Sequence, residues 1–368
     1  MRTEATFRHG TSQKTAILLV NLGTPDSADA PALRRYLKAF LSDPRVIEIP
    51  KLIWWCILNL IILQVRPKKS AAKYASIWTE EGSPLLAISK KQQAKLSEGF
   101  KVRRWDVQVE LAMRYGNPSV PSKLDELRKN GYDRILVFPL YPQYSAATSA
   151  SVFDAVFEWA KPVRNVPEFR FVKHYHDHPA YIHALTERVR SYWKAHGKPN
   201  FEQGDVLVMS FHGMPEFTLH KGDPYHCECH KTARLLAQDL GLDTTQYRVT
   251  FQSRFGRAKW LEPYTEHTLR ALGQTGVRRV DVICPGFMAD CLETLEEVNQ
   301  EVREVFKHAG GGEFHYIACL NDSDWSVSML TEITAQHLQG WPVDIGYEES
   351  MAAELASSRQ LALEMGAR

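Results

Sequence analysis

The sequence has 368 residues, 44% of them hydrophobic, which is enough to form two domains with separate cores. Its 45 basic and 43 acidic residues give a net charge of +2, which excludes a nucleic-acid binder that depends on a broad basic field. The six cysteines are few for this length and the segment Met1–Lys14 lacks the apolar core of a secretory signal, so we expect reduced thiols in a cytoplasmic protein.

Short apolar runs rich in β-branched residues alternate with helical patterns along the chain, which is typical of parallel sheets with crossover helices. The predicted strands fall into two sets of four. They are 16–21, 107–112, 134–140 and 169–175, then 206–211, 248–252, 280–284 and 314–319. The sequence therefore predicts an α/β protein of two Rossmann-like, doubly wound lobes, each with a four-stranded parallel sheet.

The predicted strands end in matching short motifs in the two halves. The first strand of each half runs into Gly-x-Pro, at Gly23–Pro25 and Gly213–Pro215, and the second ends in Arg-aromatic-Gly, at Arg114–Gly116 and Arg254–Gly256. This agreement indicates an internal duplication. The interval between the two motifs is about fifty residues longer in the first half, so we expect an insertion there.

These patterns predict three segments. An N-terminal lobe spans 1–165 with its insertion near 40–90, a C-terminal lobe spans 166–342, and a polar tail covers 343–368 as a helix or a loosely held end. Ligands of open α/β sheets bind beyond the carboxyl ends of the strands, so we expect a cleft between the lobes with the insertion above it. No Gly-x-Gly-x-x-Gly follows a strand and no P-loop motif is present, which argues against a dinucleotide or nucleotide site.

The longest uncharged run is LIWWCILNLIILQV, at Leu52–Val65 within the insertion. A membrane-spanning helix needs about 20 residues, so this run is too short to cross a bilayer. Two interpretations remain: a buried core helix, or an apolar lip that contacts a large flat ligand or the membrane surface. Arg66, Lys68 and Lys69 follow it and suit anionic headgroups or ligand carboxylates.

One ionisable ring stands at the carboxyl end of a predicted strand. His212 follows VLVMSF and precedes Gly213, whose missing side chain permits close approach. A neutral imidazole accepts a proton or binds a metal near neutral pH. His212 is therefore a candidate active-site base, and a histidine that caps the next helix is the structural alternative.

Three glutamates recur every four residues after the third strand of the same half, at Glu293, Glu297 and Glu301, with Asp290 and Glu296 beside them. On an α-helix, steps of four residues drift by about 40° each, whereas a wider π-type turn aligns them and is common at functional sites. The alternative is a solvated acidic face paired with Lys and Arg. The position of Glu293, in the first turns after a strand end, favours the active site.

The segment His226–His230 reads His-Cys-Glu-Cys-His and suggests zinc. Structural zinc sites usually take four ligands from two spaced pairs, and the sequence has no evident second pair. We therefore interpret this segment as a loop at the entry to a helix.

Seven motifs, in order and at matching spacing, give the chain its resemblance to a known family. They are LLVNLGTPDS at 18–27, RYGNPS at 114–119, YPQYS at 141–145, SFHGMP at 210–215, KGDPY at 221–225, KWLEP at 259–263 and DCLETLEE at 290–297. Over about 15–325 the chain resembles the protoporphyrin ferrochelatases, of the bacterial type without an iron–sulfur cluster.

The resemblance implies the chelatase fold and the last step of haem biosynthesis, insertion of ferrous iron into protoporphyrin IX. It implies that His212, as proton acceptor, and Glu293 face each other across the macrocycle as metal-site ligands, with Glu297 and Glu301 as a proton or metal relay. Other residues match porphyrin-binding positions of the family. They are Tyr115, Tyr141, Trp260 and Phe287 in the pocket lining, and Arg66 and Arg114 as basic groups.

The chain departs from the family pattern at its cysteines and at Leu22, which replaces a methionine found in some members. Some members bind a [2Fe–2S] cluster through a cysteine after the YPQYS motif and three near the C-terminus, but Ala146 follows Ser145 here and no cysteine lies beyond Cys319. We therefore expect no cluster and no other cofactor. Cys291 stands where some members carry histidine. The expected partners are protoporphyrin IX, ferrous iron and the membrane surface, for a monomer or weak dimer.

Two alternatives remain open from the sequence. One is a chelatase for coproporphyrin or another tetrapyrrole, such as cobalt insertion into a sirohydrochlorin; the apolar lip favours a less carboxylated substrate. The other is a non-catalytic porphyrin or haem carrier, which has no need of a base opposite a row of acids.

Overall fold

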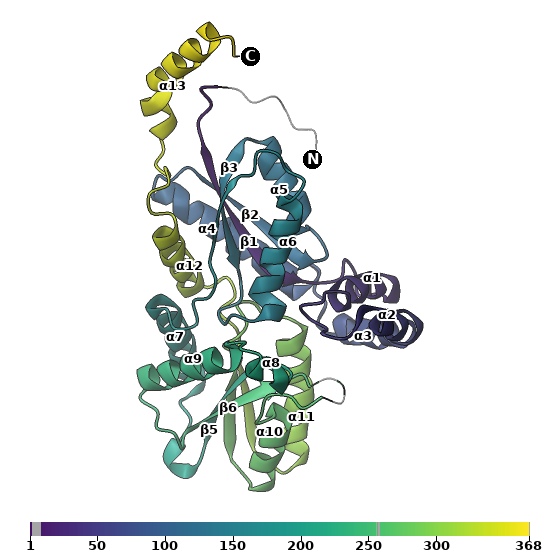
Figure 1. Cartoon of the computed structure of the whole chain (residues 1–368). Helices are drawn as coiled ribbons and strands as arrows, with labels where there is room; N and C mark the ends of the chain where they lie inside the picture. The colour runs from purple at the N-terminus through teal and green to yellow at the C-terminus, as the bar shows by residue number, and fades with distance from the viewer. Residues whose placement is uncertain (2–8, 255, 257, 368) are drawn as a thin grey trace.

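The computed structural model describes the chain except residues 2–8, 255, 257 and 368. Within the described part, eight strands form two four-stranded parallel sheets (Figure 1). The first holds β1 (Lys14–Gly23), β2 (Val107–Tyr115), β3 (Tyr132–Pro139) and β4 (Glu168–Phe171), and the second β5 (Val206–His212), β6 (Tyr247–Gln252), β7 (Arg279–Ile283) and β8 (Glu313–Ile317).

The sheets have the same strand order, β2-β1-β3-β4 and β6-β5-β7-β8, with every pairing parallel. Corresponding strands therefore occupy corresponding places, which confirms the predicted fold class. In the second half, the Arg-aromatic-Gly motif at 254–256 lies partly outside the described residues, because its aromatic residue is Phe255.

Helices connect and cover the strands. In the first half they are α1 (Ala30–Leu41), α2 (Lys51–Ile57), η1 (Leu58–Ile62), α3 (Leu63–Ile77), α4 (Pro84–Val102), α5 (Val120–Lys129), η2 (Ala146–Ala150) and α6 (Ser151–Ala160). In the second they are α7 (Pro179–His196), η3 (Phe201–Gln203), α8 (Glu216–His220), α9 (Tyr225–Leu240), α10 (Thr265–Gln274), η4 (Glu293–Val302), α11 (Arg303–His308), α12 (Asp324–His337) and α13 (Tyr347–Glu364). The tail beyond 343 is thus mainly helical, in α13.

The predicted boundary at residue 165 separates β4 from its own sheet. β4 lies beyond that residue but pairs with β3, so the first sheet extends to Phe171. The predicted strand 169–175 was also too long: Tyr175 is buried, but its backbone N–H donates to Pro142 O in the loop after β3. We propose that the lobe boundary lies after Phe171, in the segment that leads into α7.

The lobes are joined by a continuous apolar core. One buried cluster contains Ile17 and Leu19 of β1, Leu207 and Met209 of β5, and side chains of α4, α7 and α12 between them. α12 packs against both α4 and α7, so the end of the second half returns to the first (Figure 1). The two sheets are thereby held in a fixed relation.

The glycine at the carboxyl end of the first strand of each lobe is required by the same close approach. A Cβ on Gly23 would lie 1.6 Å from Tyr115 O, and one on Gly213 would lie 2.6 Å from Gln252 O. In both lobes the obstructing carbonyl belongs to the last residue of the neighbouring strand. This shared geometry explains the first repeated motif.

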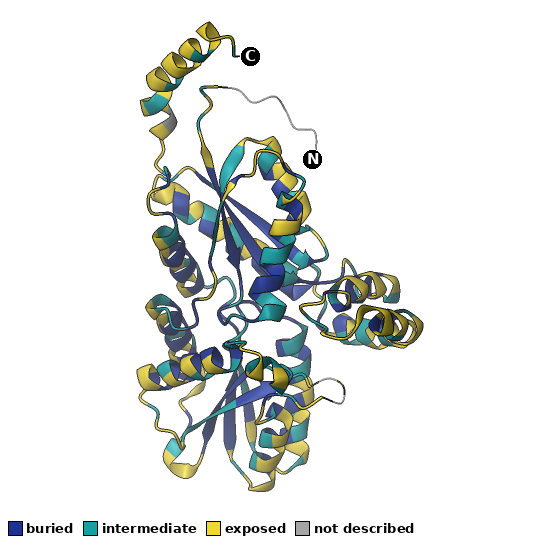
Figure 2. Ribbon diagram, viewed as in Figure 1, coloured by how far each residue is buried: buried dark blue, intermediate teal, exposed yellow. Residues whose placement is uncertain are grey.

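The insertion, together with the preceding α1, forms a helical arm of α1, α2, η1 and α3 beside the first lobe (Figure 1). Its run Leu52–Val65 is largely solvent-facing: Leu52 is 80% exposed, Leu60 65% and Trp55 59% (Figure 2). The buried-core interpretation of this run is therefore wrong. Among the described residues no helix combines the length and apolar character that crossing a membrane requires.

Candidate active site

His212 lies at the carboxyl end of β5, as predicted, with a half-buried side chain. Its Nδ1 is 2.6 Å from Gly213 O. A carbonyl oxygen can only accept a hydrogen bond, so Nδ1 carries the proton and donates it. The neutral ring then presents its lone pair at Nε2, the form that can accept a proton or bind a metal.

Gln252 connects the backbone beside His212 to the acidic segment. It pairs with His212 at the ends of β5 and β6, and its carbonyl accepts from Gly213 N at 2.7 Å. Its side-chain Nε2 donates to Glu293 O at 2.7 Å, while its Oε1 accepts from Ser210 Oγ at 2.7 Å. This buried amide therefore fixes the start of the acidic helix against the strand that ends in His212.

The row of glutamates lies on a π-helix, η4, which begins at Glu293 and runs for ten residues. Because a π-turn contains more residues than an α-turn, Glu293, Glu297 and Glu301 stand closer to one line than on an α-helix. Asp290 does not join them. It accepts hydrogen bonds from Tyr316 Oη of β8 and from Asn321 Nδ2 just beyond that strand, which anchor the entrance of η4 to this edge of the sheet.

Glu297 is the most perturbed carboxyl of the row. Burial, and then the charge of Glu293, raise its pKa from 4.5 to about 7, although a hydrogen bond from Ser253 Oγ opposes the shift. Ser253 follows β6 with a φ of +64°, a conformation that a residue with a Cβ rarely adopts. The unusual backbone at Ser253 thus accompanies the carboxyl that titrates near neutrality.

The helical arm contacts the acidic helix through α3. Lys73 Nζ lies 3.0 Å from Glu296 Oε2 and 2.7 Å from Glu301 Oε1. Arg66, a predicted porphyrin-binding residue, is half-buried on the same helix, and burial lowers its pKa while the charge of Glu297 raises it. The arm and η4 therefore form one electrostatic unit.

Aromatic side chains of the arm lie near the first glutamate of the row. Tyr36, Tyr74 and Tyr115 pack in the buried cluster of the arm, with Leu292 at its edge. Burial first raises the pKa of Tyr36 and Tyr74, and the charge of Glu293 raises both further. These phenols are therefore neutral near pH 7 and offer an apolar wall.

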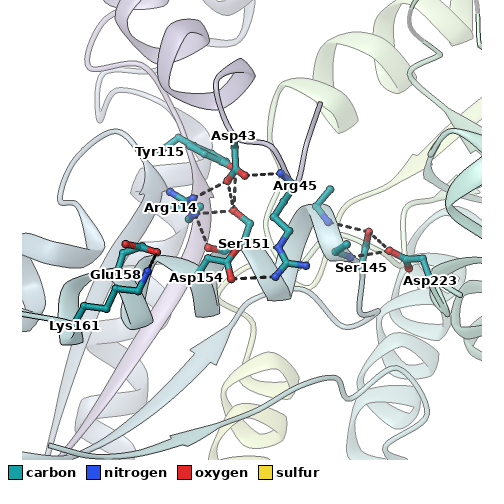
Figure 3. A network of polar contacts seen from close by, with 12 residues as sticks. Asp43, Arg45, Arg114, Tyr115, Ser145, Ser151, Asp154, Glu158, Lys161 and Asp223 are labelled. Carbon is teal, nitrogen blue, oxygen red and sulfur yellow. Dashed lines mark hydrogen bonds and ion pairs between the residues drawn. The ribbon is translucent and has the colours of Figure 1, made fainter. Parts of the chain in front are cut away.

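Arg114 and Tyr115, at the end of β2, meet a buried carboxylate at the base of the arm (Figure 3). Asp43 Oδ2 accepts from Arg114 Nη2 at 2.6 Å, from Tyr115 Oη at 2.7 Å and from Ser151 Oγ at 2.6 Å. Despite burial, these hydrogen bonds and a backbone bond from Arg45 keep the pKa of Asp43 below its usual value. The charge of Arg114 is thus already partly balanced within the protein.

Three further predicted residues lie on loops at the carboxyl ends of strands. Tyr141 follows β3 and Trp260 follows β6, and among the described residues Tyr141 Oη and Trp260 Nε1 are buried polar atoms without a hydrogen-bond partner. The Trp260 ring lies over Gly213, 3.1 Å from where a Cβ would stand. Phe287, after β7, packs beside Leu22 and Cys291.

The comparisons with known proteins agree with this arrangement. A family model described as Ferrochelatase matches residues 14–338. The chain belongs to the ferrochelatase family. A protein named "Ferrochelatase" from a Polaromonas species is 59% identical over 368 residues, covering 99% of this chain and 98% of the relative. One of the same name from Methylibium petroleiphilum is 59% identical over 360 residues, covering 97% and 98%.

A solved structure shares the fold at much lower sequence identity. "SirB from Bacillus subtilis with Fe3+" aligns with a TM-score of 0.54 and 13% identity, over 89% of this chain and 96% of that one. The likeness supports the chelatase fold. Family membership confirms the resemblance seen in the sequence and makes the chain an enzyme of the porphyrin metal chelatase class.

Sequence reasoning missed the residues that hold this ferrochelatase site together. Gln252 and Lys73 reach η4 from 41 and 223 positions away in sequence. Asp43 meets Arg114 across 71 positions. Each is a single polar residue without a repeating pattern, so only the folded chain reveals it.

Proposed function

We propose that this ferrochelatase inserts Fe²⁺ into protoporphyrin IX, with His212 as proton acceptor, Glu293 as its partner at the metal, and Glu297 and Glu301 as the relay. The observation that carries the proposal is the junction at Gln252, where the strand that ends in His212 meets the start of the glutamate helix.

Metallation requires a porphyrin to lose two pyrrole N–H protons and to expose its nitrogen lone pairs, which point inward in a planar ring. Binding energy from the periphery can drive this distortion. The tyrosines near Glu293, with Trp260 and Phe287, provide apolar surface for such binding. Tyr141 Oη and Trp260 Nε1, which have no hydrogen-bond partner within the described part of the chain, can bond to polar groups or water.

His212 is suited to remove the protons, because its Nδ1–H is committed to Gly213 O and its Nε2 lone pair is available. Carboxylates are suitable ligands for a partly hydrated divalent ion. The pKa of about 7 at Glu297 allows this group both to accept and to release a proton near neutral pH. Glu293 and Glu297 then carry protons toward Glu301 at the exposed end of the row.

We also propose that the arm contacts the membrane surface. Its exposed apolar side chains include Leu52, Trp55 and Leu60, and the cations Lys68 and Lys69 follow on α3. This combination fits the interfacial region of an anionic bilayer. The same surface would let an apolar porphyrin pass between lipid and enzyme.

The test is anaerobic addition of Fe²⁺ to enzyme and excess protoporphyrin, followed by loss of porphyrin fluorescence. We expect many turnovers per chain, a slower reaction with coproporphyrin, and a loss of at least about 100-fold in rate for His212→Ala with porphyrin affinity retained. His308→Ala, an exposed histidine on α11, is the matched control. Quenching limited to one porphyrin per chain, or near-normal turnover by His212→Ala, would contradict the proposal.

A further inference from the structure

A second group of possible metal ligands lies at a junction between the lobes. His174 and His176 belong to the segment between β4 and α7, and Glu228 stands in the first turn of α9. Each offers one ligand atom, and these atoms lie within 4.8 Å of one another. His174 Nδ1 is 2.6 Å from Glu228 Oε1, and His176 Nδ1 is 3.3 Å from Glu228 Oε2.

Two of these groups are buried in a way that their protein contacts do not fully explain. The side chains of His176 and Glu228 are each only 7% exposed. Among the described residues, His176 Nδ1 has no partner with hydrogen-bond geometry, although it points at the carboxylate. The ion pairs of Glu228 in the described chain are with the two histidines and not with Lys or Arg. A cation between these atoms would compensate the buried carboxylate.

The surroundings resemble the outer contacts of metal ligands. Tyr144 N donates to Glu228 Oε2 at 2.7 Å, which orients the carboxylate. The other ring nitrogen of His176 lies 3.9 Å from Asp177 Oδ1, and Lys231 holds that aspartate at 2.5 Å. Metal-bound histidines commonly donate from the second nitrogen to a carboxylate; Asp177 is placed for this role but must approach His176 to reach hydrogen-bond distance.

The group needs a modest contraction to hold an ion of zinc's size. The two histidines face different oxygens of Glu228, and one ligand atom from each residue lies within 4.8 Å of the others. Tetrahedral ligands at 2.0–2.1 Å from Zn²⁺ stand roughly 3.3 Å apart, so the widest pair must close by up to about 1.5 Å, and the His174 side chain, 39% exposed, is free to turn. Its exposure leaves a fourth position for water.

The His-Cys-Glu-Cys-His segment contributes to this group through its central residue. Cys229 is buried in the core, and His226 and His230 pack against Phe251. The segment is the first turn of α9 rather than a loop. Its outer histidines lie beside each other, with ring centroids 4.5 Å apart, but its cysteines diverge, with Cys227 exposed and Cys229 buried. Glu228 instead meets histidines more than fifty positions earlier in the chain.

We propose that His174, His176 and Glu228 bind one divalent transition-metal ion, with Zn²⁺ the best fit, at a site separate from His212. The ion clamps the segment between β4 and α7 to α9. The loop after β3, whose Tyr144 N bonds to Glu228, carries Tyr141 and crosses the same junction. Its Gln143 Nε2 donates to Thr232 Oγ1 at 3.0 Å, and its Ser145 Oγ donates to Asp223 Oδ2 at 3.0 Å (Figure 3). The role is structural and does not depend on iron insertion.

The experiment counts Zn²⁺ per chain by competition with a chromophoric chelator, in a His212→Ala background that weakens the proposed reaction site. We expect one Zn²⁺ per chain there, a higher melting temperature with Zn²⁺, and a loss of both in the further variants His174→Ala and Glu228→Gln. His226→Ala, on the same helix, should keep both. His174→Ala decides the question if Glu228→Gln folds poorly, because His174 is exposed.

Zinc binding that survives His174→Ala and Glu228→Gln unchanged, or no Zn²⁺ bound in the His212→Ala background, would overturn the proposal. The iron-insertion assay separates the two sites: His174→Ala on the wild-type background should retain multiple turnovers, whereas His212→Ala should not.

Discussion

Replacing Glu297 by glutamine should stabilise the protein at neutral and alkaline pH. Burial and the charge of Glu293 raise the pKa of this carboxyl from 4.5 to about 7. Below about pH 4.5 the group is protonated in the folded and unfolded states, so it costs nothing. As pH rises to 7 the unfolded state ionises first, and the folded state loses stability. At 1.36 kcal/mol for each pKa unit, the loss is about 3 kcal/mol above pH 7.

Urea unfolding of wild type and Glu297→Gln at pH 5 and pH 8 measures this effect. The gain in unfolding free energy for the variant should be small at pH 5 and reach up to about 3 kcal/mol at pH 8. Glu304→Gln, at an exposed position on α11, should show no such pH dependence. The variant should also insert iron more slowly and lose the pH-rate limb near 7. A gain that is equal at both pH values, or a loss at pH 8, would refute the reasoning.

Three further predictions concern the contacts around η4 and the arm. Lys73→Met should lower the unfolding free energy by about 1–3 kcal/mol, because Glu296, whose side chain is 8% exposed, loses its cation. Lys69→Met is the control, and equal urea midpoints for the two variants would contradict this prediction. Gln252→Leu should lower kcat about tenfold to a hundredfold with little change in porphyrin affinity, since Glu293 loses its backbone anchor; unchanged kcat would contradict it. The double variant Leu52→Gln with Trp55→Gln should weaken co-sedimentation with anionic liposomes at least about tenfold. Phe157→Gln, which changes an exposed side chain on α6, should not weaken it. Equal sedimentation of both variants would count against membrane contact by the arm.

Much of the fold could be predicted because the buried strands of a parallel sheet have continuous apolar sequences. All eight predicted strands exist, and the two sheets repeat one strand order. The main error was at β4, where buried Tyr175 reads as strand although its N–H bonds to a loop. Burial without a ladder partner leaves no distinct sequence pattern.

The candidate site was predictable where periodicity or strand position gave a signal. The four-residue spacing of the glutamates anticipated η4, and the place of His212 after an apolar run anticipated its strand end. Lys73, Gln252 and Asp43 gave no such signal, because their contacts depend on tertiary structure. Nor could the sequence decide whether Leu52–Val65 faces inward, since an apolar run fits a core or an exposed lip equally.

The position of a bound porphyrin tests the central claim most directly. Diffraction from a complex with a metalloporphyrin, with anomalous scattering used to find the metal, gives that position without assumptions about rate. We expect the metal between His212 Nε2 and the Glu293 carboxylate, with the ring edge against Tyr141 and Trp260. A macrocycle bound elsewhere, or one that leaves His212 and Glu293 facing separate spaces, would contradict the account.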